Sequence, residues 1–388
     1  MENVNRNEDA GVGDDDMAAV LPDDLQNLVL ARIPLTTLFK VRAVCKRWNS
    51  ILFHSPFLRL RAEIRSSLQQ DSFFPLLFWR QEEEEEEEDQ GFVLPDVDVT
   101  RYYWSWMGYD FATEKWQTLK PFSTPLEVNR VVTGSKSLLC LCGADCLLMC
   151  NPFTGACKEI PFKENVMHMV VDSETDTYKL IAAASTKRAR IYDSATNLWT
   201  RSGRPAPNLA LSSQTGAFWN GHLYCIAREE RSGRYGVVIL DVEGARTWSN
   251  ISFIPKETGE NFLEVQVVEC GGDIYTIVDK VIDEITLRQK SISIWKLERE
   301  SLKWALAGTM PEHLRIDLIS VGSLGSVAHD SRICIFEKAT FKAVACDMCA
   351  GLARSWYPLL LNSHKLPNFL GRRTLADIAF EPSLLTSV

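Results

Sequence analysis

The sequence predicts a multidomain protein in which a small all-α domain at the N-terminus precedes a larger all-β domain. Apolar residues between Leu21 and Leu52 recur at helical spacing, whereas from about residue 72 they alternate with a period of two in short, aromatic-rich segments. The length of 388 residues exceeds what one hydrophobic core usually supports, so two domains are expected.

The helical stretch predicts two short helices. Pro22, Asp23 and Asp24 suit the start of the first, where a missing N–H is tolerated and negative charge is favoured, and Pro34 ends it. Thr36 or Thr37 can cap a second helix, whose apolar stripe is Leu38, Val41, Cys45, Trp48 and Leu52. Because this stretch is too short to enclose a hydrophobic core, part of its apolar surface must contact the rest of the chain or another protein.

The same stretch resembles an F-box. The matching positions are Leu21-Pro22, Asp24, Val29-Leu30, Ile33-Pro34, Leu38, Arg42, Val44, Cys45, Lys46 and Trp48. Asp24 stands where Glu is commoner, and Ile33 where Leu is commoner. F-boxes dock on the Skp adaptor of a cullin–RING ubiquitin ligase, and the resemblance implies these adaptor contacts: Leu21, Pro22, Leu25, Leu30, Ile33, Pro34, Leu38, Val41, Val44, Cys45 and Trp48. The alternative is a helical hairpin that packs only against its own chain.

A third helix is expected at about residues 55–70, beginning at Ser55 and Pro56. Its apolar face is predicted to be Phe57, Leu60, Ile64 and Leu68, with the arginines on the other side. The predicted organisation is an acidic disordered tail at 1–17, the F-box at 18–60, a linker helix at 61–71 and the β domain at 72–384.

The β domain contains a repeated pattern. A strand ends in Asp or Asn, a polar turn follows, and a Trp or another apolar residue starts the next strand. Six copies occur, at residues 109–119, 150–161, 192–203, 240–251, 295–308 and 346–359. Most copies follow another strand with its own turn, and they recur every 40 to 55 residues, which is typical of propeller blades.

This repeat predicts a β-propeller of six blades, in which packing around an axis buries both faces of each sheet. Five tryptophans are expected to pack between neighbouring blades through their large apolar rings: Trp116, Trp199, Trp248, Trp304 and Trp356. Seven blades would result if the region before Tyr102 formed a blade of its own. Segments over about residues 130–311 resemble the propeller half of plant F-box proteins of the kelch-repeat and F-box-associated types. The kelch Gly-Gly doublet occurs only at Gly271-Gly272.

Charge is unevenly placed along the chain, whose net charge is −9. The acidic residues concentrate in residues 1–20 and in an uninterrupted run from Glu82 to Asp89, which is expected to be a disordered loop-tip insertion at 81–90. An acidic docking tail for a basic partner is the alternative interpretation of this run. Residues 21–65 carry a net charge of +5 and the rest of the chain about −1, so the folded bulk is nearly neutral and no nucleic-acid surface is expected. No apolar run is long enough for a membrane helix.

The sequence contains no strong motif for metal binding or catalysis. Cys140, Cys142, Cys146 and Cys150 lack the spacing of two zinc knuckles, and Cys346 and Cys349 form a CxxC without a partner pair. No phosphate loop, nucleophile elbow or paired histidine motif occurs, so no cofactor and no catalytic residue is predicted. Two charged or proline-stiffened loops, at 228–234 and 202–208, are interpreted as solvated turns or as recognition loops on the propeller rim.

The resemblances together imply a non-catalytic substrate receptor of an SCF-type ubiquitin ligase. The F-box would bind a Skp-type adaptor, and through it cullin and a RING protein, while the propeller would hold a target protein. A non-degradative scaffold or transcriptional co-regulator that uses the same two interfaces is the alternative, and a catalytic or ligand-binding propeller is a further one. Eleven cysteines with an acidic N-terminus and no signal peptide favour nucleus or cytoplasm.

Overall fold

The computed structural model describes residues 21–33, 37–38, 41, 44–51, 54–66, 73–80, 102–111, 113–119, 121–161, 166–172, 175, 177–184, 187–256, 260–281, 290–318, 323–338, 342–349, 355–359 and 373–376. The chain divides into two compact units, residues 1–70 and residues 71–388. Within the described residues, no helix combines the length and the apolarity needed to cross a membrane.

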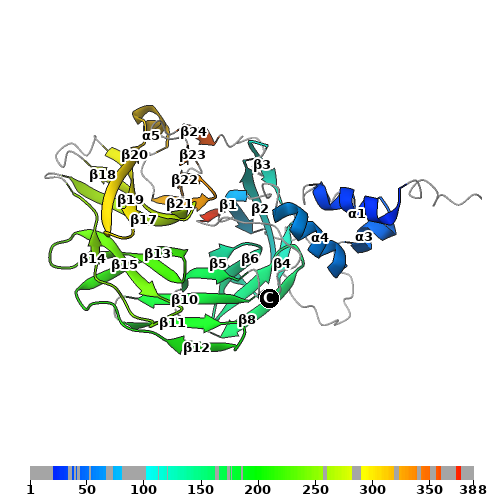
Figure 1. Ribbon diagram of the computed structural model, residues 1–388, viewed down its shortest axis with the longest axis horizontal. Coiled ribbons are helices and arrows are strands. Elements are labelled where there is room, and N and C mark those ends of the chain that lie inside the picture. Colours follow the sequence, from blue (N-terminus) through cyan, green and yellow to red (C-terminus); the bar gives the residue numbers. More distant parts are fainter. Residues whose placement is uncertain are drawn as a thin grey trace, which may run out of the picture. The chain divides into compact units, whose positions relative to one another are not determined.

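The first unit is helical, as predicted. It contains α1 (Asp23–Arg32), α3 (Lys46–Ile51) and α4 (Ser55–Ser66), and α1 packs against α4 (Figure 1). Leu30 and Ala31 of α1 and Phe57 of α4 are buried. Burial of these apolar side chains stabilises a unit whose helices are too short to persist alone in water.

The second predicted helix is interrupted: residues 37, 38 and 41 are helical, but a turn at Val44 separates them from α3 (Lys46–Ile51). The Val44 N–H donates to the carbonyl of Val41 at 3.0 Å, which closes a tight turn, and α3 begins only at Lys46. Cys45 precedes α3, and its Sγ accepts the Trp48 N–H at 3.4 Å, as an N-terminal cap would. The prediction of one continuous helix is therefore wrong at the Val44 turn; Leu52 lies outside the described residues.

Arg61 corrects the prediction that the arginines of the third helix all face away from its apolar side. The Arg61 side chain is buried, and its Nη1 donates to the carbonyl oxygens of Ala31 at 3.1 Å and Ile33 at 2.8 Å. These carbonyls end α1, where no backbone N–H is left to pair with them. A cation also suits the negative end of the helix dipole, so the charge is compensated although it is buried.

Replacing Arg61 with Met is expected to destabilise the first unit by about 2 kcal/mol, because the charged hydrogen bonds are lost and the last carbonyls of α1 are left buried. Hydrogen exchange of the α1 amides in the full chain measures the effect. Arg59→Met, at an exposed position of the same helix, is the matched control. Equal exchange rates in both variants would contradict this role for Arg61.

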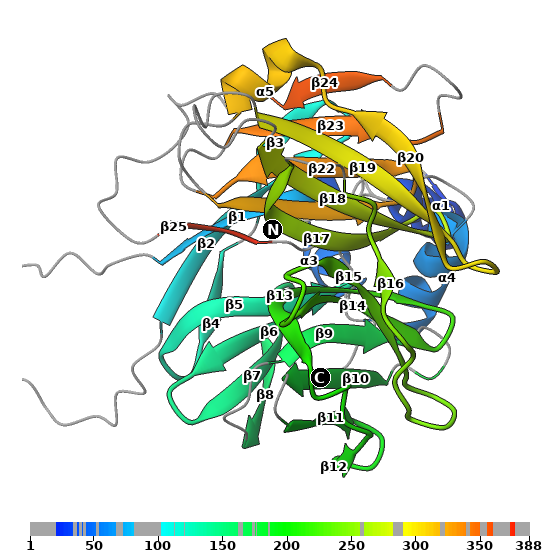
Figure 2. The same cartoon turned by 90° about the vertical axis from the view of Figure 1, so that its left-hand side faces the viewer.

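The second unit is a six-bladed β-propeller, as predicted (Figures 1 and 2). Blade one combines β25 (Arg373–Ala376), β1 (Phe73–Arg80), β2 (Tyr102–Asp110) and β3 (Lys115–Thr118), with β4 (Phe122–Thr124) paired to β2. Blade two is β5 (Val128–Ser135), β6 (Leu138–Gly143), β7 (Cys146–Asn151) and β8 (Ala156–Pro161). Blade three is β9 (Val166–Val171), β10 (Tyr178–Ala184), β11 (Lys187–Asp193) and β12 (Leu198–Arg201).

The other three blades follow the same antiparallel order. Blade four is β13 (Leu209–Trp219), β14 (His222–Glu229), β15 (Tyr235–Asp241) and β16 (Ser252–Phe253). Blade five is β17 (Asn261–Cys270), β18 (Asp273–Val281), β19 (Lys290–Glu298) and β20 (Lys303–Thr309), followed by α5 (Glu312–Leu318). Blade six is β21 (Leu324–His329), β22 (Arg332–Glu337), β23 (Ala343–Asp347) and β24 (Trp356–Leu359).

Blade one joins the two ends of the propeller sequence. β25 pairs antiparallel with β1, which pairs with β2. Strand β1, which precedes Tyr102, therefore belongs to blade one, and the described strands form six blades and no seventh. Pro75 lies where the register between β1 and β2 shifts, a position that tolerates a residue without an N–H. The predicted acidic insertion at 81–90 lies outside the described residues.

Each of the six repeat copies forms the turn into the outermost strand of one blade. In five of them the residue two positions before the Trp, or before Cys157 in blade two, has a positive φ: Glu114, Gly155, Asn197, Arg246 and Leu302. The Asp or Asn that ends the preceding strand accepts backbone N–H groups of the turn in several copies, for example Asp241 from Gly244 at 2.7 Å. This local pairing explains why the pattern was visible in the sequence.

Leu302 occupies the left-handed region at φ 51°, where its Cβ is crowded by the backbone. Leu302→Asn is expected to stabilise the propeller by about 0.5–1 kcal/mol, because Asn tolerates this conformation better. Denaturant unfolding of the full chain measures the gain. Leu306→Asn, an exposed position within β20, should give no gain, and equal gains in both variants would refute the strain argument.

The predicted packing of five tryptophans between neighbouring blades is confirmed. Each of the five packs against an apolar cluster between two successive blades: Trp116, Trp199, Trp248, Trp304 and Trp356. Two also reach back to the preceding blade through their indole N–H groups, Trp248 to the Gly203 carbonyl at 3.1 Å and Trp304 to the Ser252 carbonyl at 3.4 Å. A single repeated tryptophan can thus bury its ring between two blades and also join them through a hydrogen bond from its indole N–H.

Candidate functional site

Apolar side chains are exposed on the first unit along one side of α1. Leu21, Leu25 and Val29, spaced four residues apart, are 50%, 47% and 54% exposed. The opposite side of α1 carries the buried Gln26, Leu30 and Ala31. A helix that is apolar on both sides buries one against its own chain and leaves the other for a partner.

The structure separates the predicted adaptor contacts into three groups. Leu21, Pro22, Leu25 and Val44 are exposed, whereas Leu30 and Leu38 are buried. The partly exposed members are Ile33, Val41, Cys45 and Trp48. Pro34 lies outside the described residues. Contact with an adaptor stays a prediction for all of them, and the exposed members are the ones accessible without rearrangement.

Polar contacts fix the exposed stripe in place. The Gln26 amide donates to the Leu21 carbonyl at 2.7 Å and accepts the Trp48 indole N–H at 3.4 Å. Gln26 thereby ties the start of α1 to α3. Val29 was not among the predicted contact residues, although its spacing of four from Leu25 was a usable signal.

The two loops considered as recognition loops lie together on the propeller. The Glu230 N–H donates to the Asn208 carbonyl at 2.9 Å, and the Asn208 amide donates to the Glu229 carboxylate at 3.2 Å. Segment 202–208, which enters blade four, therefore braces the β14–β15 hairpin at 228–234. In an antiparallel meander the links between blades and the hairpins between second and third strands meet at one end of the sheet. This shared end gathers loop residues into one surface.

Two of the four clustered cysteines, Cys140 and Cys150, are buried, and Cys142 and Cys146 are partly exposed. Cys140 belongs to the buried cluster between blades two and three, and Cys150 faces Cys157 across β7 and β8. Burial raises the pKa of the Cys140 thiol and raises that of Cys225 to about 12, so both stay neutral. Among the described residues, no cluster of His, Cys, Asp and Glu could hold a metal ion.

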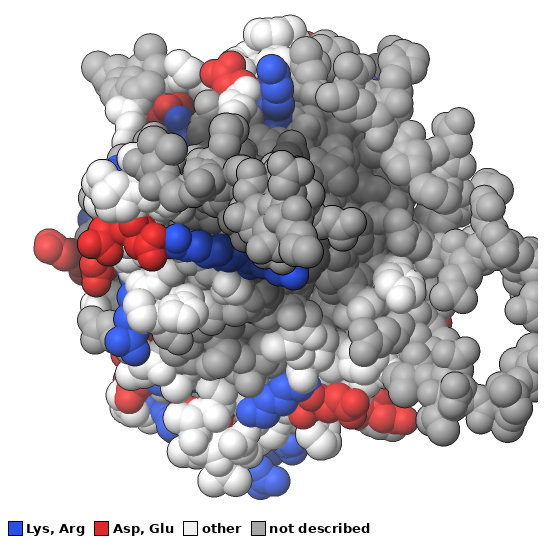
Figure 3. Space-filling view, turned by 90° about the vertical axis from the view of Figure 1, so that its right-hand side faces the viewer, with Lys and Arg blue, Asp and Glu red and all other residues white. Residues whose placement is uncertain are grey.

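The described charges are mixed. On the face in Figure 3, Lys and Arg side chains stand beside Asp and Glu side chains, and neither sign forms a continuous field over the residues described there. A nucleic-acid surface would concentrate basic side chains on one face.

An F-box-type helical unit with an exposed apolar stripe, followed by a six-bladed propeller, defines a two-part binding protein. The chain belongs to the family of the F-box associated beta propeller domain, whose model matches residues 112–346. The F-box domain model matches residues 20–60. The matched propeller model is thus of the F-box-associated type.

Two proteins of Arabidopsis thaliana are similar. F-box only protein 6 is 22% identical over 78% of this chain, and the chain spans 60% of that protein's length. An F-box/kelch-repeat protein is 21% identical over 74% of both chains.

Among solved structures, a Bacteroides thetaiotaomicron protein of unknown function aligns with a TM-score of 0.40 at 10% identity, over 73% of this chain and 78% of that one. The Pseudomonas aeruginosa periplasmic gluconolactonase aligns with a TM-score of 0.39 at 10% identity, over 70% and 78%. These scores are too low to bear on function.

Proposed function

We propose that this protein is a substrate-recognition subunit of an SCF-type cullin–RING ubiquitin ligase. Its F-box binds a Skp-type adaptor, and through it cullin and a RING protein, while the propeller holds the target. The receptor does no covalent chemistry; it raises the concentration of the target's lysines near the ubiquitin-carrying enzyme. The observation that carries this proposal is the exposed stripe Leu21, Leu25 and Val29 on a helix whose other side is buried.

Co-purification from plant cells tests the proposal. Tagged full chain is compared with a chain lacking residues 18–60, and recovery of Skp-type adaptor and cullin is measured by mass spectrometry. Recovery with the full chain alone supports the receptor role. Adaptor absent from both samples would reduce the F-box to a structural hairpin. Target candidates are the proteins retained by both chains.

The exposed stripe equally suits a scaffold that binds the adaptor without promoting degradation. Half-lives of the retained proteins, with and without proteasome inhibition, separate the two roles: a receptor shortens them and inhibition restores them. The nucleus or cytoplasm is the proposed compartment, supported by eleven free cysteines. Fluorescent tagging of the full chain tests this placement.

A further inference from the structure

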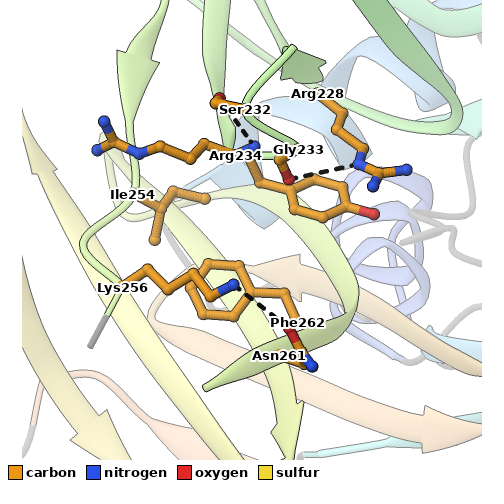
Figure 4. A pocket seen from close by; sticks show the side chains of 9 residues that line it. Arg228, Ser232, Gly233, Arg234, Ile254, Lys256, Asn261 and Phe262 are labelled. Carbon is orange, nitrogen blue, oxygen red and sulfur yellow. Dashed lines mark hydrogen bonds between the residues drawn. The ribbon is translucent and has the colours of Figure 1, made fainter. Parts of the chain in front are cut away.

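A basic cavity opens where blades four and five meet. Its volume is about 370 Å³, and it lies between the β14–β15 hairpin and the link from β16 to β17. Figure 4 shows Ser232, Gly233 and Arg234 of the hairpin on one side and Lys256, Asn261 and Phe262 on the other. This volume suits one or two peptide side chains.

The lining of the cavity carries three cations, Arg228, Arg234 and Lys256, and none of its nine described lining residues is acidic. Two carboxylates next to lining residues, Glu229 and Glu260, have other partners. Glu229 accepts hydrogen bonds from Asn208 and from the Ser232 hydroxyl, and Glu260 pairs with Lys280. Gathering like charges costs free energy that a bound anion would recover.

Aromatic rings hold the two guanidinium groups. Arg228 lies over the Tyr235 ring at 5.7 Å and Arg234 over the Phe253 ring at 4.3 Å. The Arg228 Nε donates to the Gly233 carbonyl at 3.3 Å, which leaves its terminal nitrogens for a ligand. Lys256 is steadied by the Asn261 amide oxygen at 3.3 Å. Placing the donors in advance lowers the entropy lost on binding.

Figure 4 also shows that the Arg228 and Arg234 side chains point away from each other on the hairpin side, with Lys256 on the opposite side of the cavity beside Phe262. Donors spread apart in this way suit an extended peptide better than a small free ion, because a peptide can present several acceptors in a row. Asn208 holds the hairpin through its hydrogen bonds to Glu229 and Glu230, which restrains this wall of the cavity.

We propose that this cavity binds an anionic side chain, phosphate or carboxylate, of an extended acidic peptide segment in a partner protein. The proposal rests on the proposed function, because it assigns the part of the propeller that would hold a target. Guanidinium and ammonium groups form their strongest hydrogen bonds with carboxylate and phosphate oxygens. The surrounding Tyr235 and Phe262 rings, 6.2 Å apart, offer apolar contact to the neighbouring peptide residues.

An array of short synthetic peptides of random sequence, probed with the full chain, tests the proposal. Each peptide is made with phosphoserine, glutamate or serine at its centre. The site variant is Arg228→Gln combined with Lys256→Gln. The control combines Arg188→Gln with Lys303→Gln, which are exposed positions outside the cavity and give the same change in net charge.

We expect wild type and control to select the phosphoserine and glutamate peptides over serine, and the site variant to bind them about tenfold or more weakly. Preference for phosphoserine over glutamate would identify phosphate as the natural anion; equal binding would identify a carboxylate. The proposal would be overturned if wild type bound serine peptides as well as acidic ones, or if the control variant lost as much binding as the site variant. It would also be overturned if wild type bound no peptide more strongly than the site variant does. The peptide array does not involve the adaptor. A failure to capture adaptor in the co-purification experiment would therefore overturn the proposed function and leave the peptide site to be judged by the array.

Discussion

Replacing Leu25 and Val29 together with aspartate is expected to weaken binding of a Skp-type adaptor by about 100-fold or more. Both side chains are exposed on one side of α1, so the change removes apolar anchors without opening the core. Full burial of a Leu or Val contributes about 1.5–3 kcal/mol, and each 1.4 kcal/mol is a factor of ten in affinity. A buried aspartate would add a desolvation cost.

Binding of the purified adaptor to the full chain, measured by calorimetry, gives the dissociation constants. The control replaces Leu198 and Leu263 with aspartate, because these propeller leucines are 61% and 47% exposed and match the change in chemistry and charge. Leu38 is a poor choice for such a test, because it is buried and its replacement would disturb the fold. Circular dichroism confirms that both variants keep their structure.

Unchanged adaptor affinity in the Leu25 and Val29 variant, with the fold intact, would contradict the assignment of this stripe as the docking surface. Equal weakening in the Leu198 and Leu263 control would point instead to a general effect of added negative charge. A selective loss would extend the docking surface to Val29, which was not among the adaptor contacts predicted from the sequence.

The sequence predicted the features that arise from contacts between near neighbours. The turn from Asp241 to Trp248 folds through local hydrogen bonds, so its pattern of polar and aromatic residues revealed the blades and their number. Three features were not predicted. The Val44 turn interrupts a continuous apolar stripe, Arg61 turns inward to pair with carbonyls of a different helix, and β25 pairs with β1.

Two of these misses, the Arg61 contacts and the pairing of β25 with β1, depend on residues that are distant in sequence. The Val44 turn is a local contact with Val41, and the unbroken apolar spacing around it gave no sign of it. The spacing of apolar residues predicts a helix but not which carbonyl groups of another helix its side chains will contact. Alternation likewise predicts a strand but not the strand with which it pairs. The basic cavity shows the same limit. The hairpin at 228–234 was visible as a charged loop, but its closeness to Lys256 and Phe262 depends on how blade five follows blade four.

Ending the chain after residue 372, before β25, is expected to destabilise the propeller by about 4 kcal/mol or more. β25 and β1 share four cross-strand residue pairs, Leu76 with Ala376, Leu77 with Leu375, Phe78 with Thr374 and Trp79 with Arg373. At about 1 kcal/mol for each backbone hydrogen bond, their loss alone accounts for this figure.

The position of β25 in the ring makes the expected effect larger than for an ordinary edge strand. β25 contacts β5 of blade two, and β1 contacts β21 of blade six, so blade one connects blades two and six and closes the ring. Without β25, the backbone groups of β1 lose their partner and form an open edge, which favours aggregation. Closure by a strand from the far end of the sequence removes that edge.

Thermal unfolding of the two truncated chains measures this effect. The matched control ends after residue 377 and keeps β25, so its midpoint should stay near that of the full chain, whereas the shorter chain should unfold about 10 °C lower. Adding a synthetic peptide of residues 370–380 should restore part of the loss, because binding to the folded form raises its stability. Equal midpoints for the two truncations would show that β1 needs no partner strand, and the ring would then depend on the apolar clusters between blades alone.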